Sequence, residues 1–145
     1  MKWYPQIGGY EPTGDEVEIA KTGPEGSEHK KMNSTSGIHL LDDNPQNIDK
    51  TNGNFLVNIR NKLVIAIMNT DDTDSITVTP EMSAVIKEDG VEIEVVEPTI
   101  DIAAGETVIL GPFSMNYEFA DSKIYFNWDG DALDEDILIE AFRIG

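Results

Sequence analysis

The sequence predicts an all-β fold, an antiparallel β-sandwich of jelly-roll-like or immunoglobulin-like type that is preceded by an extended N-terminal arm. Three observations lead to this class. After residue 53, short apolar or alternating segments recur roughly every ten residues, a spacing typical of sandwiches and barrels. Turn-forming residues separate these segments. No stretch of the chain has both the length and the period of an amphipathic core helix.

The first predicted strands lie at residues 54–60 and 62–69. The second of them is apolar at odd and even positions alike, which is typical of a central strand covered on both faces. The acidic segment 71–74 is a predicted loop. The next strand, at residues 75–79, alternates apolar and polar positions and ends at Pro80, because proline has no N–H to donate to a strand ladder.

Two tight turns organise the middle of the sandwich. The strands at residues 84–87 and 91–95 flank an Asp-Gly pair, which favours the positive φ angles of a two-residue hairpin turn. The strands at residues 100–103 and 107–110 flank an Ala-Gly-Glu turn. The same reasoning predicts a second hairpin there.

The last two predicted strands lie at residues 123–128 and 137–144, on either side of the acidic loop 129–136. In the first of them, Trp128 shares its parity with two other large apolar residues, which places it in the core. Tyr125 has the opposite parity, and we expect it to face outward.

The chain divides into an extended arm, residues 1–53, and a β-sandwich domain, residues 54–145, because nearly all apolar runs follow the boundary. The arm is rich in glycine, proline and polar residues, so one interpretation is a solvated terminus. The other is an arm that adds a strand to a neighbouring subunit, inserts aromatic anchors, and meets an acidic surface with its short basic run. The partner-binding residues on this second interpretation are Trp3, Tyr4, Tyr10, Val17, Ile19, Lys30 and Lys31.

Charge and composition exclude several classes of partner. The chain has 10 Lys and Arg against 28 Asp and Glu, a formal net charge of −18. Nucleic acid and anionic membrane surfaces are therefore not expected as partners. The longest wholly apolar run, residues 63–68, is too short to cross a bilayer. The absence of cysteine removes disulfides, thiolate metal sites and cysteine nucleophiles.

No constellation in the sequence indicates an enzyme. Both histidines, His29 and His39, lie in the irregular N-terminal half, and neither has a nucleophile signature beside it. There is no glycine-rich phosphate loop, and nothing selects one catalytic pair among the acids. We therefore expect a protein without catalysis and without a cofactor.

Two ligands remain as alternatives. Calcium prefers clustered oxygen ligands, although the last acidic loop lacks the glycine and glutamate that the helical calcium loop places at its sixth and twelfth positions. The candidate ligands are Asp129, Asp131, Asp134 and Asp136. A carbohydrate would need exposed aromatic rings to stack on, and the candidates are Tyr117, Tyr125 and Trp128.

Over residues 54–145 the order of short motifs forms a recurring pattern. The motifs are Asn69-Thr70, Thr77-Val78-Thr79, Ala104-Gly105-Glu106-Thr107, Gly111-Pro112-Phe113 and Tyr117. In this order the chain resembles the small β-sandwich decoration or auxiliary head proteins of tailed bacteriophages. The long arm and the insertion at residues 129–136 depart from the pattern.

The resemblance implies a non-enzymatic virion protein on the capsid exterior. Its partner would be the major capsid protein, and it would stabilise the shell by bridging capsid subunits. The resemblance also implies self-association, often as a trimer. The alternative from a different class is a carbohydrate-binding or host-adhesion module, on a head fibre or elsewhere.

Overall fold

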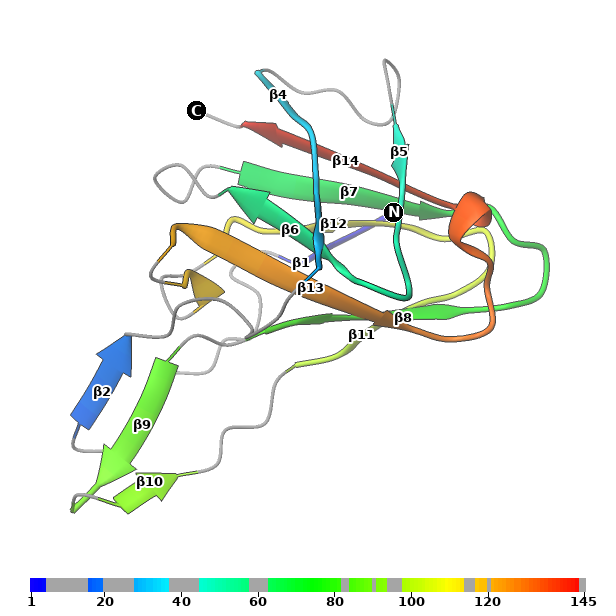
Figure 1. Cartoon of the computed structure of the whole chain (residues 1–145). Helices are drawn as coiled ribbons and strands as arrows, with labels where there is room; N and C mark the ends of the chain where they lie inside the picture. Colours follow the sequence, from blue (N-terminus) through cyan, green and yellow to red (C-terminus); the bar gives the residue numbers. More distant parts are fainter. Residues whose placement is uncertain are drawn as a thin grey trace.

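In the computed structural model, two large β-sheets pack face to face and a small third sheet projects from them (Figure 1). The structure describes residues 1–4, 16–19, 28–36, 45–57, 63–81, 84–89, 91–93, 98–113, 117–119 and 121–143. The predicted all-β sandwich class is confirmed. Within this part of the chain, no helix is long and apolar enough to cross a membrane.

The first large sheet has six strands. In spatial order they are β1 (Lys2–Tyr4), β12 (Thr107–Leu110), β7 (Leu63–Asn69) and β14 (Ile137–Arg143), with β4 (Ser34–Ser36) and β5 (Gln46–Asn47) both paired to β14. The second large sheet has five strands. Its order is β11 (Ile100–Ile102), β8 (Ile76–Pro80), β13 (Lys123–Asp129), β6 (Asn54–Val57) and β3 (Lys30–Lys31).

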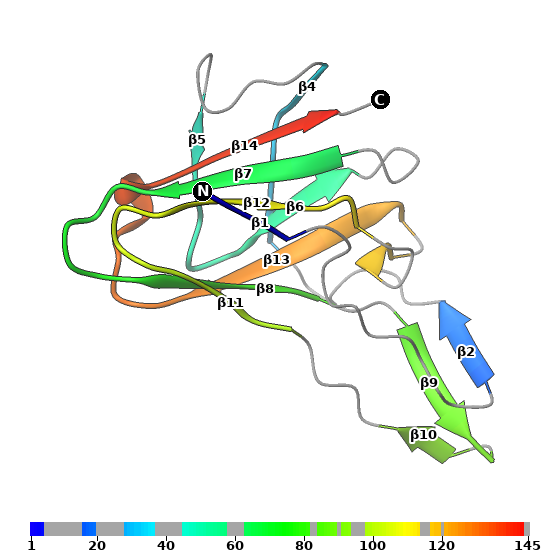
Figure 2. The same ribbon diagram turned by 180° about the vertical axis from the view of Figure 1, so that it is seen from behind.

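The projecting sheet has three strands and lies away from the sandwich in both views (Figures 1 and 2). Its order is β10 (Val91–Ile93), β9 (Ala84–Glu88) and β2 (Glu16–Ile19). The predicted Asp-Gly hairpin is confirmed here, because Val91 pairs with Glu88 and Asp89 adopts a φ of 51° in the turn.

Among the described strands that follow residue 53, every pairing is antiparallel, as the sequence predicts. The parallel pairings involve β1, β3 and β4, which all come from the first 53 residues. An antiparallel sandwich is thus extended at its edges by strands from the N-terminal segment. Met32 and Ile48, from the same segment, are buried in the core that the two large sheets share.

The core confirms the parity predicted for β13. Ile124, Phe126 and Trp128 are buried between the sheets. The Trp128 indole N–H donates a hydrogen bond of 2.9 Å to Oδ1 of the buried Asn54. A buried indole needs such a partner, because an unpaired donor away from water is costly.

The second predicted hairpin is wrong. Its turn is present, with Gly105 at a φ of 76°, but β11 pairs with β8 in the five-stranded sheet and β12 pairs with β7 in the six-stranded sheet. The turn therefore carries the chain from one sheet to the other. A hairpin within one sheet and a crossing between two sheets look alike in sequence. In both, two alternating strands flank a tight turn and bury their apolar side chains in the same core.

Three such crossings, β7 to β8, β11 to β12 and β13 to β14, lie at the same end of the sandwich (Figure 1). Asn69, the buried last residue of β7, joins two of them. Its Nδ2 donates to the carbonyl oxygens of Asp74 at 2.9 Å and Ile102 at 3.2 Å, while its Oδ1 accepts from the N–H of Asp71 at 2.9 Å. The loop end is therefore braced by one buried amide.

Candidate partner-binding surface

Trp3 is the most exposed large aromatic residue among those described, with 60% of its surface accessible. It lies in β1, opposite Ile109 of β12, at one edge of the six-stranded sheet (Figure 2). Its indole N–H donates to the carbonyl oxygen of Gly111 at 2.9 Å, and the Gly111 N–H donates to the carbonyl oxygen of Tyr4 at 3.1 Å. The ring is thus fixed in orientation while most of it faces solvent.

The outer face of the six-stranded sheet continues from Trp3 as an apolar row. Residues directly opposite each other in neighbouring strands share a face. The pairings place Trp3, Ile109, Ala66 and Glu140 in one row across four strands. Ala66 and Ile109 belong to a second apolar cluster, separate from the main core.

Glu140 is the polar member of this row and is unusual in its surroundings. Its side chain is buried, with 5% of the residue accessible. Neither of its carboxylate oxygens has a hydrogen-bond partner within the described part of the chain. A buried carboxylate without a partner is expensive, so we expect Glu140 to lower the stability of the fold at this face.

Tyr4 lies on the opposite face of β1 from Trp3. It pairs with Leu110 and packs, half-buried, against the main core. Lys2 shares that face and forms an ion pair with Glu106, with Nζ to Oε2 at 3.3 Å. Tyr4 therefore contributes packing within its own chain. Tyr10 lies outside the described residues.

Val17 and Ile19 lie in β2, which pairs with β9 of its own chain. Val17 is opposite Ile86, and Ile19 is opposite Ala84. The strand-like piece of the N-terminal segment thus adds to a sheet, and that sheet is the small projecting one of the same molecule (Figure 1).

Lys30 and Lys31 form β3 at the edge of the five-stranded sheet, where they pair with Asn54 and Phe55 of β6. Lys30 forms an ion pair with Asp49, with Nζ to Oδ2 at 3.0 Å. Lys31 is exposed and has no ion pair among the described residues. Of the two lysines, Lys31 leaves its charge open to a partner.

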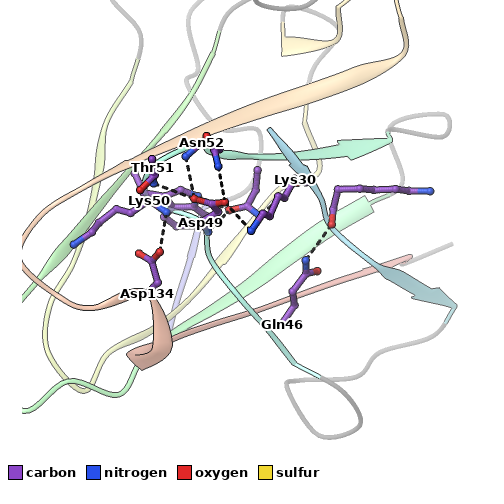
Figure 3. Close-up of polar contacts among 10 residues, drawn as sticks. Lys30, Gln46, Asp49, Lys50, Thr51, Asn52 and Asp134 are labelled. Carbon is purple, nitrogen blue, oxygen red and sulfur yellow. Dashed lines mark hydrogen bonds and ion pairs between the residues drawn. The ribbon is translucent and has the colours of Figure 1, made fainter. Parts of the chain in front are cut away.

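Asp49 is the centre of the polar contacts that organise the turn at residues 49–52 and tie it to Lys30 of β3 (Figure 3). Its Oδ1 accepts the backbone N–H groups of Thr51 at 3.0 Å and Asn52 at 2.9 Å. Its Oδ2 accepts the Asn52 amide at 3.1 Å and pairs with Lys30. These hydrogen bonds, the one from the Asn52 backbone most of all, lower the pKa of Asp49 to about 2 despite its burial.

Lys50 connects the same segment to the last acidic loop. Its ammonium donates to the carbonyl oxygens of Gly130 at 3.0 Å and Ala132 at 2.8 Å, and its backbone N–H donates to Oδ2 of Asp134 at 3.3 Å. Sequence reasoning missed Asp49 and Lys50. The available signal was the Asp-x-x-Asn spacing, in which an aspartate side chain accepts nearby backbone N–H groups and stabilises a turn.

The four aspartates considered for calcium are not gathered around one point. Among the described residues, which include all four, no group of three or more histidine, aspartate or glutamate side chains is placed to hold an ion. Asp129 instead accepts the neighbouring Gly130 N–H at 3.0 Å, and Asp134 accepts from Lys50.

The aromatic residues considered for sugar stacking, Tyr117, Tyr125 and Trp128, are all buried. The expectation that Tyr125 is exposed is wrong. It does lie on the outer face of β13, but the rings of His29 and Phe119 pack against it edge-on at centroid distances of 5.1 and 5.0 Å. Its hydroxyl donates to Oδ2 of Asp121 at 2.6 Å. Burial, with a smaller effect of Asp121, raises the pKa of Tyr125.

Comparison with known protein families, curated proteins and solved structures finds no match to this chain.

Proposed function

We propose that this protein is a non-enzymatic structural component of a tailed-phage virion, which binds the outer surface of the capsid and stabilises it by bridging major capsid subunits. The order of motifs over residues 54–145 supports the proposal, as does the net charge of −18, which suits a position away from packaged genome. The proposal includes self-association, with a trimer as the expected form.

The observation that carries the proposal is Trp3, an exposed indole fixed by a hydrogen bond to Gly111. Tryptophan is enriched among residues that dominate the energy of interfaces, and fixing its ring in advance reduces the entropy lost on binding. Burying the exposed part of the ring in a partner pocket would contribute about 2–4 kcal/mol per copy. Many such contacts over a shell would add up by multivalency.

The first experiment counts copies. Quantitative mass spectrometry of purified particles from the source should give a ratio near one to one between this chain and the most abundant shell protein. A few copies per particle would point to a vertex or fibre component. Complete absence from the particles would overturn the proposal.

The second experiment tests the anchor on particles that lack this chain. Trp3→Ala should weaken particle binding at least tenfold, while Trp3→Phe, which keeps most of the apolar area, should lose less. Lys2→Ala is the matched control, because Lys2 is exposed on the same strand but lies on the opposite face of the sheet from Trp3. Equal binding by all three variants would show that Trp3 is not part of the interface.

A further inference from the structure

A hollow of about 430 Å³ opens at the loop end of the sandwich, beside the short 3-10 helix η2 (Asp134–Asp136). We call it the η2 pocket, and its lining residues are Lys50, Leu133, Asp134 and Glu135. Trp3 is not among its lining residues, and the pocket plays no part in the capsid proposal above. It is shallow and open to solvent, so it suits a single side chain and not a whole small molecule.

The walls of the η2 pocket are held in place by the fold. Lys50 is tied to Gly130 and Ala132 through its ammonium. Its backbone N–H also donates to Asp134, and Figure 3 shows this last bond. The side-chain amide of Asn47 donates to the carbonyl oxygen of Glu135 at 3.0 Å. A ligand would therefore meet a surface that is already organised, which lowers the entropic cost of binding.

Three groups at the pocket are not engaged by the rest of the described chain: one apolar side chain that is exposed and two carboxylate groups with unpaired oxygens. Leu133 is 54% exposed, which is high for a leucine in a loop that is otherwise tightly bonded. Glu135 is exposed, and its carboxylate has no hydrogen bond or ion pair within the described ranges. Oδ1 of Asp134 is inaccessible to solvent and also lacks a hydrogen-bond partner there.

These groups match one kind of ligand, a cation on an aliphatic stem. The ammonium of Lys50 is occupied by two carbonyl oxygens, so the unpaired charge in the pocket is negative. A metal ion would need several carboxylates around one point, and those of the described chain are not gathered in that way. A lysine or arginine side chain, in contrast, packs its methylene groups on an apolar residue while its head meets carboxylates.

We propose that the η2 pocket binds a lysine or arginine side chain presented by a partner protein. The stem lies on Leu133, the cationic head pairs with Glu135, and the unpartnered oxygen of Asp134 adds to the negative potential. The net charge of −18 attracts a basic partner to the molecule as a whole, and the pocket would then select the side chain that it presents.

The test uses the isolated full chain and two small probes, Nα-acetyl-lysinamide and Nα-acetyl-argininamide, with Nα-acetyl-norleucinamide as the uncharged control. Amide chemical shifts are followed by NMR during titration. Both cationic probes should move the amides of residues 50 and 133–136 first, and norleucinamide should not. Binding should weaken several-fold when the ionic strength is raised.

Two variants distinguish binding in the pocket from a general attraction of cations to this acidic protein. Glu135→Gln and Leu133→Ser should each weaken probe binding about two- to fivefold, and neither removes a contact that the fold uses. Asp72→Asn is the matched control, since Asp72 is an exposed acid in a different loop. The proposal is overturned if the shifts spread evenly over the acidic loops, if all three variants bind alike, or if norleucinamide binds as well as the cations. None of these outcomes depends on particles, so the result is independent of the capsid proposal.

Discussion

Replacing Asp49 with asparagine should destabilise the protein in a way that depends on pH. The folded-state pKa of Asp49 is about 2, against 3.8 for an ordinary aspartate. Each unit of difference corresponds to about 1.4 kcal/mol, so the ionised carboxylate contributes up to about 2.4 kcal/mol. Its partner Lys30 is 66% exposed, and screening by solvent reduces the expected value to about 1–2 kcal/mol.

The sign follows from proton linkage. Because folding lowers the pKa of Asp49, the unfolded chain binds its proton first as the pH falls. The stabilisation is fully present above about pH 4 and is lost as the pH falls through about 2. Asparagine retains an oxygen for the N–H groups of Thr51 and Asn52, so the variant removes the charge with little change of shape.

Urea unfolding of wild type and Asp49→Asn, followed by the fluorescence of the buried Trp128, gives the difference in unfolding free energy at each pH. We expect about 1–2 kcal/mol at pH 7 and close to zero near pH 2. Using the difference cancels the general effect of acid on a chain of net charge −18. Asp72→Asn is the control for loss of one acidic charge, because Asp72 is an exposed acid in a different loop. A difference for Asp49→Asn that stays constant from pH 7 to pH 2 would refute the reasoning.

Two further variants test other parts of the fold by the same urea measurement. Glu140→Met removes a buried carboxylate that has no hydrogen-bond partner among the described residues, and it should raise the unfolding free energy by about 1–3 kcal/mol; a loss of stability would show that the carboxylate is compensated. Gly53→Ala and Gly105→Ala place alanine at similar φ angles of 79° and 76°. The new Cβ at Gly53 would lie 2.7 Å from the Phe126 carbonyl oxygen, whereas nothing lies within 4 Å of it at Gly105. Gly105→Ala should therefore cost about 1–2 kcal/mol for the backbone alone, and Gly53→Ala about 1–3 kcal/mol more; equal costs would contradict the steric argument.

The strands and their faces could be predicted from the sequence because the apolar pattern has a period of two. In β13 the alternation placed Trp128 in the core, and the Asp-Gly pair placed the β9–β10 turn. Which strands pair was harder to predict. The segments at residues 100–102 and 107–110 satisfy the pattern of a hairpin. Only their strand partners, β8 in one sheet and β7 in the other, show that the chain crosses between the sheets.

The contacts of the N-terminal segment could be predicted only in part. The sequence marks Trp3 as a candidate partner-binding anchor, and in the structure its side chain is exposed. Met32 and Ile48 are isolated apolar residues among polar ones, so no local pattern indicated that they reach the core. The turn at Asp49 had a local signal in its Asp-x-x-Asn spacing. The side-chain bonds of Lys50, in contrast, join residues about eighty positions apart, and such contacts leave little trace in a single sequence.

The hydrogen bonds of Asn69 determine which loops of the sandwich can accept an inserted peptide. An insertion between Asp71 and Asp74 would pull apart the two loops that its amide joins, and would disturb the sandwich itself. The turn at Asp89, in contrast, lies at the tip of a small sheet that, among the described strands, is separate from both large sheets (Figure 1). For displaying an epitope on this scaffold, the acidic loop at residues 71–74 is therefore the wrong site, and the tip of the projecting hairpin is the place to graft.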